Sequence, residues 1–235
     1  MIQTLRTRGP LVAACLAGAV VITGLSGCGL VNKINAVRHG IDANRAAIHA
    51  LTQSLKSGGA TAFAATYVTT GGSPVTVTYA VRPPTDVTFM QSGGSSKLDL
   101  VSNSSGEFSC TAVASSPWAC QKLGKAQAVS QNQIVDFYTP SHWVTYLNLL
   151  SVGAGLAGDK VTNSTMTVNG FSMKCVNFRA KGVPGTSTIC TTSQNILGYV
   201  KVASDATSFE IKSYTSSPSA SLFQLPAGAK VTQGN

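Results

Sequence analysis

The sequence is poor in the side chains on which most enzymes depend. Its 235 residues include 8 acidic residues and 3 histidines, and only 11% of them are charged. The two glutamates, Glu107 and Glu210, lie far apart in the chain, and nothing around them marks the carboxylate pair of a glycoside hydrolase. No H-E-x-x-H, Walker or G-x-S-x-G motif is present. We therefore expect no enzymatic activity, no catalytic residue and no cofactor.

The histidines and cysteines also lack the spacing of a metal site. His39 and His49 lie on a predicted helix, where we expect a solvated face, and His142 next to Trp143 has no acid or nucleophile partner in the sequence. No C-x-x-C pair exists, and the histidines are far from the cysteines in the chain, so the sequence predicts no zinc site.

No apolar run is long enough to cross a membrane. The longest runs from Leu11 to Gly24, short of the roughly 20 residues that a span needs. Arg6 and Arg8 precede this run and Leu25-Ser26-Gly27-Cys28 follows it, which is the order of a signal peptide. The last four residues resemble the bacterial lipobox, and this resemblance implies cleavage before Cys28 and attachment of diacylglycerol to its thiol. An ordinary secretory signal with a chance cysteine is the alternative.

Removing residues 1–27 of 235 leaves 208 residues, which fits one domain. The net charge falls from +9 to +7, because Arg6 and Arg8 are removed with this segment. The remaining chain has 15 basic and 8 acidic residues. The basic residues are scattered, and no basic stripe is interleaved with aromatic residues. We expect an anionic lipid surface, and no nucleic acid, as a partner.

Four cysteines remain after Cys28, an even number that predicts disulfides in an exported chain. Three connectivities are possible. We favour Cys110 with Cys120 and Cys175 with Cys190, because each pair flanks a turn-rich segment between two predicted strands. Each bridge would then stabilise a hairpin by about 3 kcal/mol.

The clearest helix is predicted over residues 30–56, followed by Ser57-Gly58-Gly59 as a stop. Its apolar stripe would pack on the domain, pair as a short coiled coil or lie on lipid near Cys28. The members of the stripe are Val31, Ile34, Val37, Ile41, Ile48, Leu51 and Leu55.

From residue 60 the apolar period changes to two, which predicts strands. Two central helices are expected to interrupt them at residues 126–138 and 141–152, and Asn169-Gly170 is the strongest hairpin signal. A further edge strand is expected within residues 222–230. The expected strands are 63–67, 75–81, 87–91, 97–101, 107–112, 118–123, 161–168, 171–178, 187–192, 196–202 and 208–214.

This order predicts an α+β fold with a mostly antiparallel sheet of about 11 strands. At this point the chain resembles the LolA/LolB-like lipoprotein-carrier fold of mycobacterial LppX- and LprG-type lipoproteins. The resemblance rests on the lipobox, the helix ending Leu55-Lys56-Ser57, the Arg82-Pro83-Pro84 step, the helix around Trp143 and the closing Phe223-Gln224-Leu225-Pro226. It implies a curved half-barrel with the N-terminal helix and the two central helices on its concave face, around a cavity for acyl chains.

We therefore expect three segments: a signal peptide at residues 1–27, a lipid-anchored N-terminal segment with its helix at 28–59, and a β-rich domain at 60–235. The expected function is lipid binding by an envelope lipoprotein on the outer face of the cytoplasmic membrane, with lipid transport as the role that such binding would serve. The alternative is a non-catalytic anchored interaction or sensor module with an envelope protein partner. The residues expected to line a cavity are Phe89, Trp143, Leu147 and Leu150.

Overall fold

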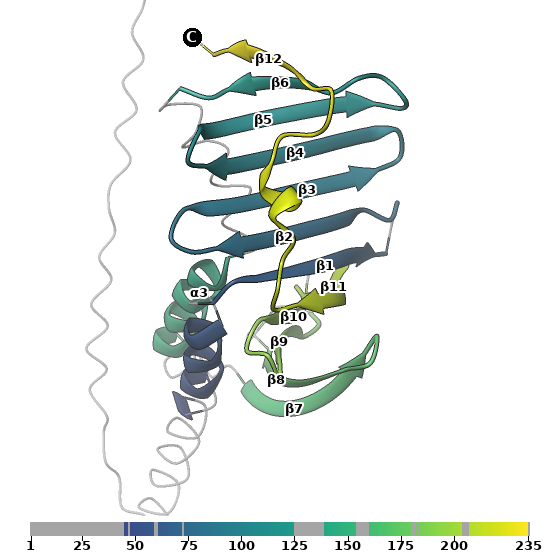
Figure 1. Ribbon diagram of the computed structural model, residues 1–235. Helices are drawn as coiled ribbons and strands as arrows, with labels where there is room; N and C mark the ends of the chain where they lie inside the picture. Colours follow the sequence, from purple (N-terminus) through teal and green to yellow (C-terminus); the bar gives the residue numbers. More distant parts are fainter. Residues whose placement is uncertain are drawn as a thin grey trace, which may run out of the picture. The chain divides into compact units, whose positions relative to one another are not determined.

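The computed structural model describes residues 45–46, 48–58, 61–71, 73–124, 139–153, 160–179, 182, 184–203 and 207–234, without the side chains of 140–141 and 149–153 (Figure 1). All of them belong to one unit of the chain, His39–Asn235. The expected helix at 126–138, the first part of the helix at 30–56, and Cys28 lie outside the described residues.

Twelve strands of the described residues form one open sheet in the order β12-β6-β5-β4-β3-β2-β1-β11-β10-β9-β8-β7. Each neighbouring pair is antiparallel except β12 and β6, which are parallel. The predicted class, mostly antiparallel β with helices, is confirmed. The strands are β1 (Phe63–Thr70), β2 (Thr76–Arg82), β3 (Asp86–Gly93), β4 (Ser96–Asn103), β5 (Gly106–Val113), β6 (Ala119–Lys122), β7 (Lys160–Val168), β8 (Phe171–Arg179), β9 (Ser187–Thr192), β10 (Leu197–Lys201), β11 (Ser208–Thr215) and β12 (Lys230–Gln233).

The turn between β7 and β8 has the predicted form. Asn169 and Gly170 both have positive φ, 51° and 82°, as the two central residues of a type I′ hairpin turn require. The Asn169 side chain donates through Nδ2 to the Ile211 carbonyl of β11 at 2.8 Å. The tip of this hairpin is therefore tied to β11, which is three positions from β8 and four from β7 in the sheet.

The C-terminal segment differs from the prediction. The sequence predicts an edge strand within residues 222–230, whereas the structure has a 3₁₀ helix η1 (Ala220–Phe223) and then β12 (Lys230–Gln233). Leu225-Pro226 does not join the ladder, since proline has no N–H to donate. The edge strand β12 therefore begins only after Pro226, at Lys230.

Two helices pack on one face of the sheet. The first is described from residue 45 to 58, with residue 47 left out, and the second is α3 (Pro140–Gly153). Pro140 occupies the first position of α3, one residue before the predicted start, and the Thr139 hydroxyl accepts from the His142 backbone N–H at 3.3 Å. We call residues 45–58 the N-terminal helix.

The apolar stripe of the N-terminal helix is packed on the domain. Ile48, Leu51 and Leu55 are buried in one core cluster with Trp143 and Leu147 of α3. The same cluster contains residues from the strands that flank β1 on either side in the sheet. Within it, the rings of Tyr67 and Phe209 stack with their centroids 4.4 Å apart. Of the three expected arrangements, the described part of the stripe therefore has the first, in which it packs on the domain. The sheet residues of the cluster include Phe63, Tyr67, Val77, Tyr79, Phe89, Val161, Val176, Ile189, Val200, Phe209 and Ile211.

The opposite face of the sheet is covered by residues 216–229, which we call the strap. Figure 1 shows this yellow segment crossing the sheet from β11 to β12. Phe223 of η1 is buried against Ala64 and Ala80, and Arg82 lies over its ring at 4.8 Å. Asn103 donates through Nδ2 to the Phe223 carbonyl at 2.8 Å. One aromatic residue thus holds the middle of the strap.

Both predicted disulfides are present. Cys110 pairs with Cys120 and Cys175 with Cys190, and each pair lies directly opposite in adjacent antiparallel strands. Disulfides form and persist in oxidising compartments, which agrees with an exported chain. No helix of the described residues is long and apolar enough to cross a membrane.

Gly58 sets how closely the N-terminal helix approaches the turn between β9 and β10. A Cβ added there would lie 2.0 Å from the Asn195 backbone oxygen, and backbone atoms cannot rotate away as a side chain does. We expect Gly58→Ala to lower the free energy of unfolding by about 1–3 kcal/mol, as overpacking does. Urea denaturation would measure this, with Ser57→Ala, on the exposed side of the same turn, as the control. An unchanged midpoint for Gly58→Ala would contradict the close approach.

Candidate functional site

Two grooves separate the N-terminal helix from strands β7, β8 and β9. Groove A, of about 490 Å³, is bordered by Leu51 of the helix and by Cys175 and Val176 of β8. Groove B, of about 720 Å³, is bordered by Met166 and Met173. Both volumes lie in the range of ligand sites in proteins. Further lining residues are Ala50, Asn163 and Ser164 in groove A, and Thr167, Ser172, Thr192, Ser193 and Asn195 in groove B.

Four polar residues line both grooves and therefore mark where they meet. These residues, which we call the polar row, are Ser54, Thr165, Lys174 and Thr191. Thr165 of β7 and Thr191 of β9 lie directly opposite Lys174 of β8, one on each side. Residues directly opposite in adjacent strands project from the same face. The row thus crosses three strands and faces Ser54 on the N-terminal helix.

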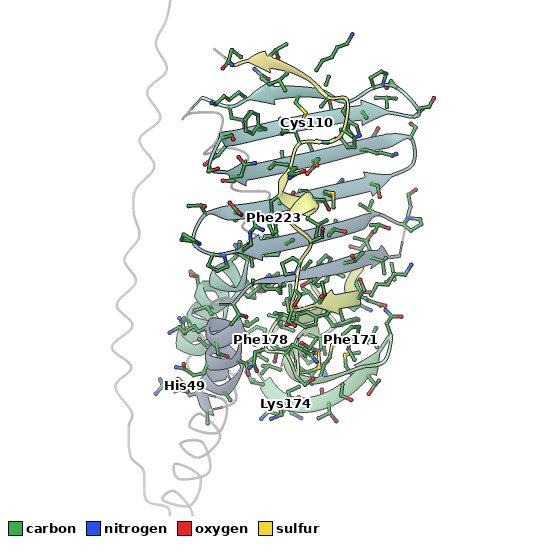
Figure 2. All side chains as sticks on the ribbon, in the orientation of Figure 1. His49, Cys110, Phe171, Lys174, Phe178 and Phe223 are labelled. Carbon is green, nitrogen blue, oxygen red and sulfur yellow. A yellow bond between two sulfur atoms is a disulfide. The ribbon has the colours of Figure 1, made fainter. Side chains whose placement is uncertain are left out.

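A third groove, of about 460 Å³, lies between the N-terminal helix and α3. Its described lining residues include Arg45, His49 and Asn148. Ala50 borders both this groove and groove A, so the two are neighbours. Figure 2 shows His49 and Lys174 towards the same end of the domain, far from Cys110.

The residues expected to line a cavity have a different place. Phe89 on β3 is 0% exposed, and Trp143 and Leu147 of α3 are also buried members of the core cluster. None of them is among the lining residues of the three grooves. Leu150 belongs to α3, but its side chain lies outside the described part of the structure. Ligand binding by these four residues stays a prediction.

The grooves depend on residues that the sequence did not single out. Thr165 and Lys174 lie on strands whose polar residues look like those of any solvated sheet face. Thr191 lies on β9, where the last four residues are all buried, so its sequence looks like that of an ordinary core strand. The grooves exist because a helix more than 100 residues earlier in the chain packs beside these strands. No local pattern carries that information.

The acidic residues of the described structure lie away from the grooves. They are Asp86, Asp99, Glu107 and Glu210, on β3, β4, β5 and β11. Asp99 is buried, and burial raises its pKa from the ordinary 3.8 to about 6, although a hydrogen bond from the Thr88 hydroxyl at 3.1 Å lowers the pKa. Within the described residues, no three His, Cys, Asp or Glu side chains gather in a way that would hold a metal ion.

One glycine-rich segment has the spacing of a dinucleotide-binding loop but a different context. Residues 153–158 have the pattern G-x-G-x-x-G. A dinucleotide site needs this pattern after a strand and before a helix, so that the pyrophosphate meets the helix N-terminus. Here the segment follows α3 and precedes β7, the reverse order. We assign it no cofactor role.

Comparison with known proteins gives little further guidance. No family model and no curated protein matches the chain. Among solved structures, a structure of PNGF-II covers 74% of this chain and 32% of its own length, with 9% identity and a TM-score of 0.31. The chain spans about a third of that protein, and a similarity at this level carries no argument about fold or activity.

Proposed function

We propose that this chain is a cell-envelope lipoprotein that binds a lipid or lipid-like ligand between the N-terminal helix and β7–β9. In this proposal Cys28 carries the lipid anchor, and the domain lies on the outer face of the cytoplasmic membrane. The fold would be a curved half-barrel of the LolA/LolB-like kind with the helices on its concave face.

The observation that carries the proposal is the mixed lining of grooves A and B. The half-buried Met166 and the edges of Leu51 and Val176, which are each 4% exposed, form the apolar part of the lining. Burying an acyl chain against apolar surface is favourable by about 25 cal/mol per Å². The polar row stands beside them, where a head group would stay hydrated or hydrogen-bonded. An amphipathic ligand matches both surfaces, whereas a fully polar ligand would leave the apolar part of the groove wet.

The proposal is tested by blocking groove A from an exposed position. Thr165→Trp places an indole in the groove, and we expect it to weaken lipid binding about tenfold, because the apolar surface is then occupied. The matched control is Thr162→Trp, a change at another exposed threonine of β7, which is absent from the groove linings. Binding would be measured by titrating a fluorescent acyl-labelled phosphatidic acid in detergent-free buffer.

The protein for these assays needs neither an apolar leader nor its own lipid. We would export it with a cleavable secretory signal in place of residues 1–27 and with Cys28→Ser. Native mass spectrometry of the same sample should show about one lipid per chain. Equal binding by the Thr165→Trp and Thr162→Trp variants would contradict the placement of the ligand in groove A.

A second candidate function is an anchored interaction module. The observation in its favour is that Phe89, Trp143 and Leu147 are packed in the core. A protein whose aromatic and leucine residues fill its interior needs no ligand to cover them. Failure of the unaltered protein to take up any lipid, in solution or from the host, would support this candidate over the carrier.

A further inference from the structure

We infer that the polar row is an anion subsite that takes the phosphate or carboxylate group of the ligand, with Lys174 as its cation. This inference rests on the proposed function and narrows the ligand to an acidic amphiphile. Three observations support it: the position of Lys174, a buried hydroxyl beside it that has no partner among the described residues, and the distribution of charge in that part of the chain.

Lys174 stands at the centre of the row, and no described residue supplies a counter-ion to it. Its side chain is exposed, and among the described residues it forms no ion pair or side-chain hydrogen bond. Hydroxyls flank it on both sides, Thr165 on β7 and Thr191 on β9. An ammonium group between two hydroxyl donors presents the hydrogen bonds that phosphate and carboxylate oxygens accept.

The buried hydroxyl of Thr191 supports the binding of an anion in the grooves. Thr191 is only 2% exposed, and it borders both grooves. Its hydroxyl makes no hydrogen bond to any described residue, whereas the neighbouring Thr192 hydroxyl accepts from the Gln194 N–H at 3.2 Å. A buried polar group without a partner is destabilising, and most such groups in folded proteins are paired. A ligand oxygen held by Lys174 would supply the partner.

The surrounding charge favours an anion. The described residues of the N-terminal helix and of β7–β10 include several basic side chains and no acidic one. Lys160 and Arg179 even lie directly opposite each other at the open end of β7 and β8, an unfavourable pairing of like charges. Asp159 and Asp205 lie outside the described residues. The basic side chains are Arg45, Lys56, Lys160, Lys174, Arg179 and Lys201.

The apolar residues of the same site indicate the chemistry of the rest of the ligand. Val176 follows Lys174 by two residues and so projects from the same face, and Leu51 faces it from the N-terminal helix in groove A. An acidic group on Lys174 would place an attached chain against these two residues. The chemistry that fits is an acidic head group joined to a hydrocarbon chain, as in a phospholipid or a fatty acid.

The test compares two fluorescent lipids with the same acyl chains, phosphatidic acid and diacylglycerol, on the protein with Cys28→Ser described above. We expect the unaltered protein to prefer phosphatidic acid by about tenfold or more, and Lys174→Gln to remove most of that preference while leaving diacylglycerol binding within about twofold. A charge-assisted hydrogen bond of about 1.5 kcal/mol corresponds to this tenfold change. Lys97→Gln, an exposed lysine on β4 outside the grooves, is the matched control.

Thr191→Val gives a second measurement that separates a binding role from a structural one. Valine has the shape of threonine without the hydroxyl, so the unliganded variant should be as stable as the unaltered protein or more stable. Its affinity for phosphatidic acid should fall about fivefold. A loss of thermal stability in Thr191→Val would show that the hydroxyl is already paired within the fold and would overturn this part of the inference.

The outcomes distinguish the inference from the proposed function. If both lipids bind equally and Lys174→Gln changes neither, the anion subsite is wrong and lipid binding stands. If neither lipid binds to the unaltered protein, the proposed function fails first. Displacement of phosphatidic acid by millimolar inorganic phosphate alone, with no preference for lipid phosphate, would identify the row as a site for free phosphate and would overturn the lipid assignment.

Discussion

Replacing Phe223 by alanine is expected to lower the free energy of unfolding by about 3–5 kcal/mol, the usual range for a buried phenylalanine. The ring is 2% exposed between Ala64 and Ala80, and it is the buried apolar anchor of the 3₁₀ helix in the strap. Alanine would leave a cavity and would also remove the contact with the Arg82 guanidinium. Urea denaturation of the two proteins measures the difference.

Two control variants separate the contribution of the Phe223 ring to stability from that of neighbouring residues. Arg82→Gln removes the cation over the ring and the exposed ion pair with Asp86, and we expect a loss of about 1 kcal/mol or less. Val231→Ala truncates an apolar side chain that is 47% exposed on β12, so its effect should be smaller still. If Phe223→Ala were no more destabilising than these two, the strap would not be held by its aromatic residue.

Asp99→Asn is expected to raise stability at neutral pH. The carboxyl group is 4% exposed on β4, directly opposite Cys110, on the face that the strap covers. Burial raises its pKa from 3.8 to about 6, so in the folded protein the charged form is disfavoured relative to the unfolded chain. At 1.36 kcal/mol for each pH unit, the penalty is about 3 kcal/mol.

The sign of the pH dependence follows from that raised pKa. Between pH 4 and 6 the folded protein keeps a proton that the unfolded chain has released, so stability falls as the pH rises through this window. Below about pH 4 both states are protonated and the penalty disappears. Asp99→Asn should therefore be about 2–3 kcal/mol more stable than the unaltered protein at pH 7 and equal to it near pH 3.5.

Thermal unfolding of both proteins at a series of pH values tests this. The other described carboxylates, Asp86, Glu107 and Glu210, are the same in both proteins, so the difference between the two curves isolates Asp99. The Thr88 hydroxyl remains able to donate to the amide oxygen of the variant. A variant less stable than the unaltered protein at pH 7 would mean that the Asp99 charge is satisfied in the fold.

Most strands and turns were predictable from local pattern. The period of two located β1–β11 to within a few residues, because one face of each strand meets an apolar layer and the other meets a polar one or solvent. Asn169-Gly170 specified its own turn, since both residues tolerate positive φ. The cysteine pairs followed from the same pattern, because residues flanking a short hairpin turn lie opposite each other.

The C-terminal segment shows the limit of local pattern. Leu222 to Lys230 has the apolar content of a strand, yet its middle crosses the sheet as the strap and only Lys230–Gln233 joins the ladder, parallel to β6. A parallel pairing with β6 is a contact across more than 100 residues. Nothing in the sequence of either segment specifies it.

The strand-forming segments, the hairpin turns and the disulfide pairs could be predicted from the sequence, because each depends on neighbours within about fifteen residues. The burial of Phe89, Trp143 and Leu147 in the core, and the site shared by Ser54, Thr165, Lys174 and Thr191, arise only when distant segments pack together. A groove forms where two distant elements fail to fill the space between them. That property belongs to the packing of the whole domain, and no single segment carries it.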